Sequence, residues 1–178
     1  MVDGTTGCDG TRNGAPGCAA VDLSDRGLLL DAGERSRVAE WACLAMSELG
    51  LDGEVRVRLV GDGEMSAAHV RFAGVAGTTD VLTFDLRDEG AKASHPRAMD
   101  VDIYACVDEA RRQAAARGHE VERELVLYVV HGVLHCLGYD DHDEGGHREM
   151  HAAEDRVLEA IGVGAVYGRE DDRAEGRA

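Results

Sequence analysis

Apolar residues recur along the chain with two different periods. In some segments every second residue is apolar, as in a half-buried strand, and in others apolar residues recur every three to four positions, as in an amphipathic helix. The predicted strands are residues 21–24, 54–60, 78–85 and 98–104. The predicted helices are residues 34–49, 62–72, 108–117, 120–137 and 144–161. This mixture, which ends in two helices, predicts an α+β fold: a small single-domain sheet packed with helices.

The two ends of the chain lack this periodicity. Residues 1–20 are rich in Gly, Thr and Asp, and residues 163–178 form a charged tail. We expect both ends to be disordered and residues 21–162 to form one domain. Three local features are also predicted, namely a loop at residues 86–97 and helix caps at Asp62 and Asp108.

Composition and charge narrow the class of protein. The 178 residues fit one domain, and the net charge of −16 argues against a protein that coats nucleic acid by bulk electrostatics, although a local basic groove is compatible with it. No apolar stretch approaches about 18 residues, and the N-terminus lacks the pattern of a signal peptide. The five cysteines have no metal-finger spacing and do not predict a disulfide framework. We expect a cytoplasmic protein that does not enter a membrane.

The segment after residue 130 has the strongest chemical signal. His131 and His135 lie one turn apart on the predicted helix 120–137, so their imidazoles point the same way and can bind one metal ion. Gly138 ends the helix, and the following turn brings Asp141 or His142 to the same point. Three protein ligands with a fourth position open are typical of a catalytic zinc, which lowers the pKa of its bound water to about 7. The sequence therefore predicts a hydrolase with a zincin-like metal-binding helix and one Zn²⁺ per chain.

Other histidines and a cysteine fit structural roles better. His69 lies on an apolar helical stripe, which favours a histidine at the edge of the core. His147 and His151 form a second pair at the same spacing, which we assign to the polar face of the last helix near Arg148, Glu149 and Glu154. Cys136 points about 100° away from His135 around the helix and is interpreted as a core thiol.

The residue after the first histidine separates this site from zinc peptidases. Their helix motif is His-Glu-x-x-His, in which the glutamate is the general base. Gly132 occupies that position here, so a peptidase of this type would lack its base. Gly132 is also expected to leave open space beside the metal for a bulky substrate.

The segment from His131 to Asp140, His-Gly-Val-Leu-His-Cys-Leu-Gly-Tyr-Asp, resembles the signature of the YbeY family of bacterial rRNA maturation factors. Thr79-Asp-Val-Leu-Thr-Phe84 resembles a strand motif of the same family, and Asp102-Ile103 and Arg123-Glu-Leu125 resemble two shorter segments. The matches occur in the family's order over about residues 53–160. The histidine motif with its Gly-Tyr-Asp tail is the specific part.

The resemblance implies a zinc ion held by three side chains and a single-strand-specific endoribonuclease. It implies action on ribosomal RNA of the small subunit, in 16S rRNA 3′-end maturation and ribosome quality control, with neither DNA nor a membrane as partner. His131 and His135 would act in catalysis through the metal-bound water.

Two positions depart from the family's pattern. The family's third histidine falls on Asp141, with His142 one place later, so either residue is a candidate third ligand. The family's arginine, a candidate phosphate contact, falls on Ala73. Arg71 lies two places earlier and is a candidate for this catalytic role, but it lies about 200° away around a helix and is not an automatic substitute.

Two alternative functions remain open at this point. One is a non-catalytic ribosome-assembly factor in which zinc only fixes the turn onto the helix, a reading that Ala73 and the acidic charge favour. The other is a metal hydrolase acting on another substrate class such as peptides, against which Gly132 argues.

Overall fold

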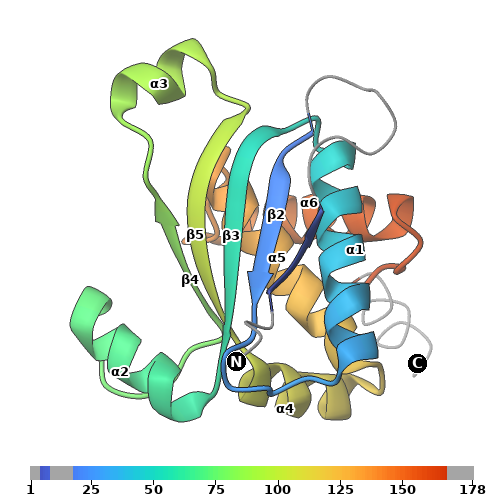
Figure 1. Ribbon diagram of the computed structural model, residues 1–178. Coiled ribbons are helices and arrows are strands. Elements are labelled where there is room, and N and C mark those ends of the chain that lie inside the picture. Colours follow the sequence, from blue (N-terminus) through green and yellow to red (C-terminus); the bar gives the residue numbers. More distant parts are fainter. Residues whose placement is uncertain (1–4, 9–17, 168–178) are drawn as a thin grey trace, which may run out of the picture.

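A mixed sheet of five strands crosses the molecule (Figure 1). This computed structural model describes the backbone of residues 5–8 and, with side chains, residues 18–167. The strands are β1 (Thr5–Cys8), β2 (Ala20–Ser24), β3 (Asp52–Val60), β4 (Val81–Asp85) and β5 (Ala98–Cys106). Their order across the sheet is β1-β2-β3-β5-β4. The inner strands β2, β3 and β5 run parallel, whereas β1 and β4 run antiparallel to their neighbours.

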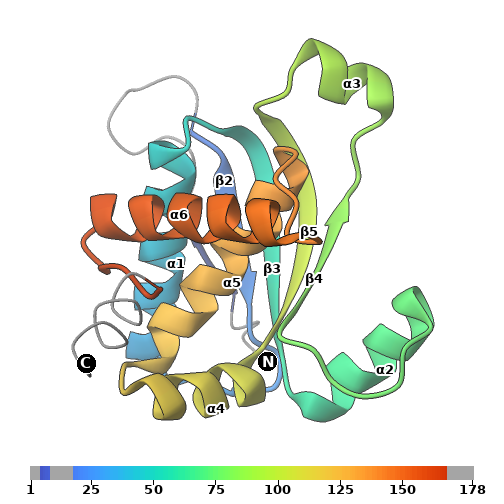
Figure 2. The same cartoon turned by 180° about the vertical axis from the view of Figure 1, so that it is seen from behind.

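The longer helices gather on one face of this sheet. The helices are α1 (Ala32–Glu48), α2 (Asp62–Ala73), α3 (Glu89–Ser94), α4 (Val107–Arg117), α5 (Val121–Cys136) and α6 (Glu144–Ala160). Figure 2 shows α5 against the back of the sheet with α6 lying across it, while α2 and α3 project from opposite ends. The sheet and this helical layer make the two layers expected of an α+β fold, so the predicted fold class is confirmed.

The core lies between the sheet and α5. Val55 and Val57 on β3 pair with Val101 and Ile103 on β5, and all four side chains are buried. Eleven of the 16 residues of α5 are buried. A helix that is apolar on nearly every side lies inside the molecule. This burial explains the continuous apolar run of residues 125–130 before His131.

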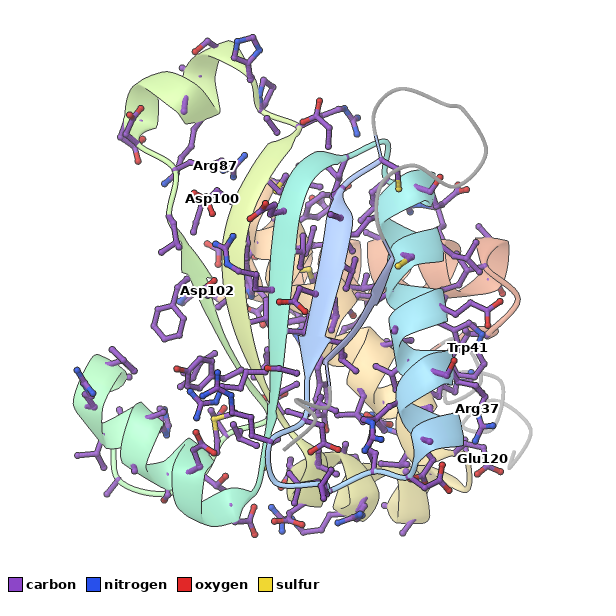
Figure 3. All side chains as sticks on the ribbon, in the orientation of Figure 1. Arg37, Trp41, Arg87, Asp100, Asp102 and Glu120 are labelled. Carbon is purple, nitrogen blue, oxygen red and sulfur yellow. The ribbon has the colours of Figure 1, made fainter. Side chains whose placement is uncertain are left out.

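The opposite face of the sheet is polar and charged. Arg56 on β3 forms ion pairs with Glu54, Asp100 and Asp102, and the last two lie on β5 (Figure 3). These side chains alternate with the buried valines, as strands with one buried face require. On this face one arginine thus pairs with three carboxylates.

The predicted strands and helices are all present, with ends shifted by a few residues, and the three local predictions are wrong. The loop predicted at residues 86–97 contains α3, because Asp88 accepts a hydrogen bond from the Ala91 amide at 2.7 Å and caps this short helix. Asp62 and Asp108 do not cap the helices they were expected to begin. Instead the Asp108 carboxylate accepts a hydrogen bond from the Asp62 amide at 2.9 Å, so a residue of α4 stabilises the start of α2.

Parts of the two end segments are ordered by pairing. Residues 5–8 pair with β2, within the segment predicted to be disordered. At the other end, the Val166 amide donates a hydrogen bond to Asp155 at 2.6 Å, and Val166 is buried. Residues 1–4, 9–17 and 168–178 of the predicted tails lie outside the part of the chain that the structure describes.

The described residues bear on two further expectations, one about the cysteines and one about membrane-spanning helices. Cys43 is disulfide-bonded, which the scattered cysteines do not predict, whereas Cys18, Cys106 and Cys136 are free thiols. Among the described helices none combines the length and the apolar character needed to cross a bilayer.

Candidate metal centre

Two imidazoles meet at the C-terminal end of α5. His131 and His135 lie one turn apart, and their Nε2 atoms are 3.0 Å from each other. Their side chains are 25% and 33% exposed, so the pair is sheltered by the protein yet reachable from solvent. The two rings stand nearly perpendicular, at 87°. This geometry directs two nitrogen atoms toward one point at the protein surface.

Both imidazoles are fixed from behind by hydrogen bonds. The His131 Nδ1–H group donates to the fully buried carboxylate of Glu154 on α6 at 2.7 Å. The His135 Nδ1–H group donates to the Tyr139 carbonyl oxygen at 3.0 Å. With the proton on Nδ1 in each ring, both Nε2 atoms carry a lone pair directed at the shared point. This is the tautomer that a metal-binding histidine needs.

Electrostatics at this pair follow from burial and the Glu154 carboxylate. Burial opposes a charged imidazole, but the hydrogen bond and charge of Glu154 outweigh it and raise the pKa of His131. Burial in turn raises the pKa of Glu154, although His131 counteracts this effect. Each group therefore stabilises the charged form of the other.

The turn after α5 brings a carboxylate to the imidazoles. Gly138 adopts a φ of +93°, a left-handed conformation that favours glycine and reverses the chain after the helix. The Asp141 carboxylate oxygens then lie 3.9 Å from His131 Nε2 and 3.8 Å from His135 Nε2. His142 instead points into solvent, where its side chain is 85% exposed and pairs with Asp140. Of the two candidate third ligands, the structure brings Asp141 to the pair.

These donor atoms fit a metal ion. Tetrahedral zinc with bonds of about 2.0–2.1 Å places its ligand atoms about 3.3 Å apart. The two Nε2 atoms are 3.0 Å apart, and Asp141 approaches them with different oxygens, Oδ2 at 3.9 Å from His131 and Oδ1 at 3.8 Å from His135. Two lone pairs and a carboxylate facing one another are mutually repulsive unless a cation lies between them. His131, His135 and Asp141 could therefore hold a metal ion. A second group, Asp140, Asp141 and His142, also has suitable spacing but is more exposed.

Gly132 serves packing and does not leave open space. A Cβ atom at this position would lie 2.2 Å from the Thr83 Oγ1 atom of β4, closer than real Cβ atoms approach. The expectation that Gly132 makes room for a bulky substrate is wrong, because Thr83 already fills that space. The glycine lets α5 approach β4 closely, and so positions the histidines relative to the sheet.

The sequence around this metal centre matches a known protein family. Residues 32–162 match the sequence profile of the family described as "Endoribonuclease YbeY". The chain belongs to the YbeY endoribonuclease family. "Endoribonuclease YbeY" of Mycobacterium ulcerans is 37% identical over 129 residues, which cover 70% of this chain and 72% of the relative. The protein of the same name in Mycolicibacterium paratuberculosis is 33% identical over 164 residues, covering 89% and 92%.

A solved structure agrees with the YbeY fold. The solution structure of TM1509 from Thermotoga maritima matches with a TM-score of 0.50 and 25% identity, covering 89% of this chain and 95% of that one. The resemblance read from the sequence is thus confirmed, together with the enzyme class that it implies, an endoribonuclease.

The candidate catalytic residue Arg71, and His69 and Cys136, which were assigned structural roles, take no part in the histidine cluster of this YbeY member. Arg71 is exposed on α2, with its guanidinium group 5.2 Å from the ring centre of its neighbour Phe72. His69 is half-buried and its Nδ1 atom is 3.1 Å from the Gly77 carbonyl oxygen. Cys136 is a half-buried free thiol whose pKa burial raises to about 11.

Two functional residues were not found by reading the sequence. Glu154 was assigned to the polar face of α6, yet it is fully buried and holds His131. Its spacing of four from Met150 and three from Val157 places it on the buried stripe, which is the signal that could have revealed it. Arg87, buried and paired with Asp85, donates a hydrogen bond to the Cys136 carbonyl oxygen at 2.9 Å and thereby fixes the end of α5. A single arginine in a predicted loop gives no such signal.

Proposed function

We propose that this chain is a zinc-dependent endoribonuclease that cuts single-stranded RNA, with the small-subunit ribosomal RNA as its substrate. The observation that carries the proposal is the convergence of His131 Nε2, His135 Nε2 and Asp141 on one point, with both imidazoles fixed from behind. Membership of the YbeY family supports RNA as the substrate. Maturation of the 16S rRNA 3′ end and ribosome quality control in the cytoplasm are the proposed cellular roles.

Zinc is the proposed ion because two imidazoles and one carboxylate match its preferred ligands. Bound there, it would supply a Lewis acid that lowers the pKa of water and polarises a phosphoryl oxygen. His131 and His135 would hold the ion through Nε2, and Asp141 is the proposed third ligand. Glu154 keeps the proton of His131 on Nδ1, and the Tyr139 carbonyl oxygen does the same for His135.

The neighbours of the site favour a phosphodiester over a peptide substrate. Gly132 stands where a zinc peptidase carries its general-base glutamate, and Thr83 fills the space beside it. Because the chain carries a net charge of −16, RNA binding would depend on local contacts and weaken as salt rises.

The test is RNA cleavage by the purified full chain before and after metal removal. A chelator should abolish cutting of a single-stranded RNA spanning the 16S 3′ end, and added Zn²⁺ should restore it. His131→Ala should lower the rate at least about a thousandfold, since it removes an ion ligand. His147→Ala, which removes a histidine of equal spacing on α6, is the matched control and should change the rate less than twofold.

A second candidate function is a non-catalytic ribosome-assembly factor whose metal only fixes the turn. It is favoured by Ala73 at the family's arginine position and by the exposed place of Arg71 on α2. The test uses wild-type protein with its metal site fully occupied. If this protein cuts no RNA but still restores ribosome assembly in cells that lack the gene, the assembly role is established and the enzymatic one is overturned.

A further inference from the structure

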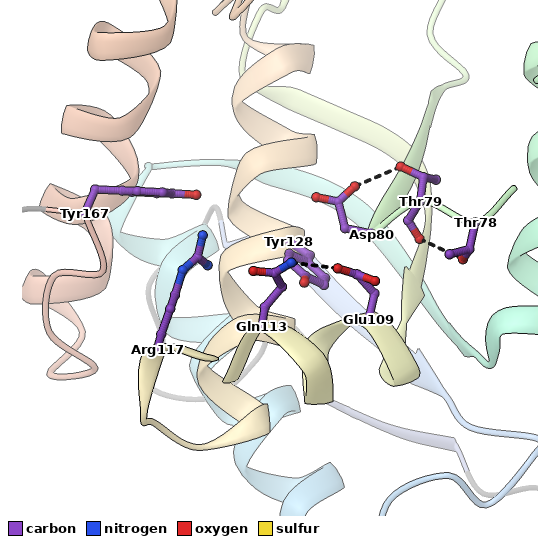
Figure 4. Close-up of a pocket in the computed structure, with 8 residues that line it drawn as sticks. All are labelled: Thr78, Thr79, Asp80, Glu109, Gln113, Arg117, Tyr128 and Tyr167. Carbon is purple, nitrogen blue, oxygen red and sulfur yellow. Dashed lines mark hydrogen bonds between the residues drawn. The ribbon is translucent and has the colours of Figure 1, made fainter. Parts of the chain in front are cut away.

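A cavity of about 350 Å³ lies between α4, α5, the residues that lead into β4 and the last described residues. Figure 4 shows its lining, which includes Asp80, Glu109, Gln113, Arg117, Tyr128 and Tyr167. None of these residues is a candidate metal ligand. The volume is at the lower end for small-molecule sites, so it suits one nucleobase or nucleoside and not a length of strand.

The cavity adjoins the histidine cluster. Tyr128 precedes His131 by three residues on α5, so the two side chains share one side of the helix. Tyr167 stacks on His151 with 3.5 Å between the ring centres. His151 lies on α6 one turn before Glu154, the residue that binds His131. An RNA whose phosphate lies at the cluster would therefore have the cavity within reach of an adjacent base.

One residue that lines the cavity, Tyr128, has a buried hydroxyl group without a hydrogen-bond partner among the described residues. The Tyr128 side chain lines the cavity, the residue is 4% exposed, and its hydroxyl bonds to no other described atom. Burial raises the pKa of this phenol, so the group stays protonated and able to donate or accept. A buried polar atom left unpaired is unfavourable and calls for an explanation, and a ligand atom placed against it is one.

The remaining polar groups mostly present acceptor atoms. Asp80 uses its Oδ1 atom to accept from the Thr79 hydroxyl at 2.9 Å and from the Val81 amide at 2.8 Å, and its Oδ2 atom has no partner among the described residues. Gln113 donates through its amide nitrogen to Glu109 at 2.7 Å, which leaves its side-chain carbonyl oxygen as an acceptor. Such a lining favours a ligand that brings N–H donors.

Arg117 is the cation of this lining and is held in place. Its guanidinium group bonds to the buried Glu124 carboxylate at 2.8 Å and lies 5.4 Å from the Tyr167 ring centre. Figure 4 shows the hydroxyl end of Tyr167 pointing across the gap toward Asp80. The recognition groups thus converge on one space from three directions.

We propose that this cavity is a nucleobase pocket, which takes one unstacked base beside the scissile phosphate and prefers bases carrying an exocyclic amino group. Adenine, cytosine and guanine direct amino hydrogens at acceptors such as Asp80 and Gln113. Uracil has a carbonyl oxygen where cytosine has its amino group and would set that oxygen against the same acceptors. The inference rests on the proposed function for the identity of its ligand as RNA.

A binding experiment tests the pocket without relying on cleavage. The zinc-loaded full chain, labelled with ¹⁵N, is titrated with two nucleotide pairs, AMP against IMP and CMP against UMP, and amide shifts are followed by NMR. Within each pair an exocyclic amino group is replaced by a carbonyl oxygen, and the adjacent ring nitrogen gains a hydrogen. AMP and CMP should bind at least about fivefold more tightly than their partners and shift the amides of Asp80, Gln113 and Arg117.

Matched variants show whether the named atoms are responsible. Tyr128→Phe removes only the unpaired hydroxyl and should weaken AMP and CMP binding, whereas Tyr104→Phe, on the opposite face of the sheet, should not. Asp80→Asn presents an amide donor and should shift the preference toward UMP and IMP. Asp100→Asn is its control, and thermal melting of each variant checks the fold, because Asp80 also binds the Val81 amide.

Cleavage then separates this inference from the proposed function. RNAs differing only by cytidine or uridine next to the cut should be cleaved at unequal rates by wild type and at more equal rates by Tyr128→Phe. Cleavage without base preference, together with equal nucleotide binding, would overturn the pocket and leave the endoribonuclease standing. Selective nucleotide binding without any RNA cleavage would leave the pocket standing and overturn the proposed activity.

Discussion

Two histidine pairs with the same spacing have different surroundings in this molecule. His131 and His135 on α5 have both Nδ1 atoms held by acceptors and both Nε2 atoms directed at one point beside a carboxylate. His147 and His151 on α6 have rings 3.9 Å apart and tilted by 56°. His147 is exposed, and His151 stacks on Tyr167.

The difference shows what a spacing of four residues can and cannot specify. The helix alone places two imidazoles side by side in both pairs. Only on α5 do a buried glutamate, a backbone carbonyl and the turn after Gly138 fix the rings and add a third ligand atom. Among the described residues, the groups with metal-ligand spacing include the α5 pair and not the α6 pair.

Substitution of the residue after the first histidine should give the largest effect. Gly132→Ala should lower the free energy of unfolding by about 2 kcal/mol, because the new methyl group would lie 2.2 Å from Thr83 Oγ1. The better helix propensity of alanine, worth about 1 kcal/mol, would only partly offset this clash. Chemical denaturation followed by circular dichroism measures the change.

The equivalent position in the second pair is the matched control. Arg148 follows His147, and its side chain is 71% exposed, so Arg148→Ala should change the unfolding free energy by less than about 0.5 kcal/mol. Adding Thr83→Ala to Gly132→Ala should restore part of the loss. A Gly132→Ala protein as stable as wild type would show that the approach of α5 to β4 is not as close as described.

Loss of the buried carboxylate should have an intermediate effect, on metal affinity. Glu154→Gln keeps the size of the side chain but replaces the charged acceptor of the His131 Nδ1–H group. The affinity for zinc should fall about 10- to 100-fold, as measured by competition with a chelator. Glu149→Gln, on the exposed side of α6, should leave the zinc affinity unchanged. Equal zinc affinities in the two variants would show that Glu154 does not support the metal site.

The smallest effect concerns the second pair and pH. Burial and the neighbouring His147 lower the pKa of His151, so the folded chain holds this imidazole neutral where the unfolded chain would protonate it. The stability linked to His151 is therefore present above the unfolded pKa of about 6.5 and is lost as the pH falls toward the folded pKa. Between pH 7.5 and 5.5, the unfolding free energy of His151→Gln should decrease less than that of wild type. His95→Gln, at an exposed histidine far along the chain from His151, is the control and should follow wild type.

The sequence was sufficient for most of the strands and helices and for the histidine pair, but not for β1 or α3, which fall in segments predicted to be a disordered tail and a loop. Strict alternation of apolar and polar residues along β3 indicates a strand with one buried face. The long apolar segment of α5 indicates a helix that is buried on nearly all sides. The pairing of α5 with β4 was not predictable in detail. The role of Gly132 depends on Thr83, which is 49 residues away and comes into contact only through the fold.

Tertiary contacts also decided the functions of single acidic residues. Asp108 looked like a cap of its own helix and instead stabilises α2, and Glu154 looked like a solvated residue and instead binds His131. The choice between Asp141 and His142 depended on the path of a turn. One residue of difference in that path directs one side chain to the imidazoles and the next into solvent.

Metal content per chain tests the central claim most directly. Elemental analysis should find about one zinc ion in wild type and in His142→Ala, and almost none in His131→Ala or Asp141→Ala, with circular dichroism confirming that each variant is folded. That result would establish His131 and Asp141 as ligands. Retention of zinc by Asp141→Ala together with its loss from His142→Ala would contradict the geometry described, and a folded wild type without metal would overturn the zinc site itself.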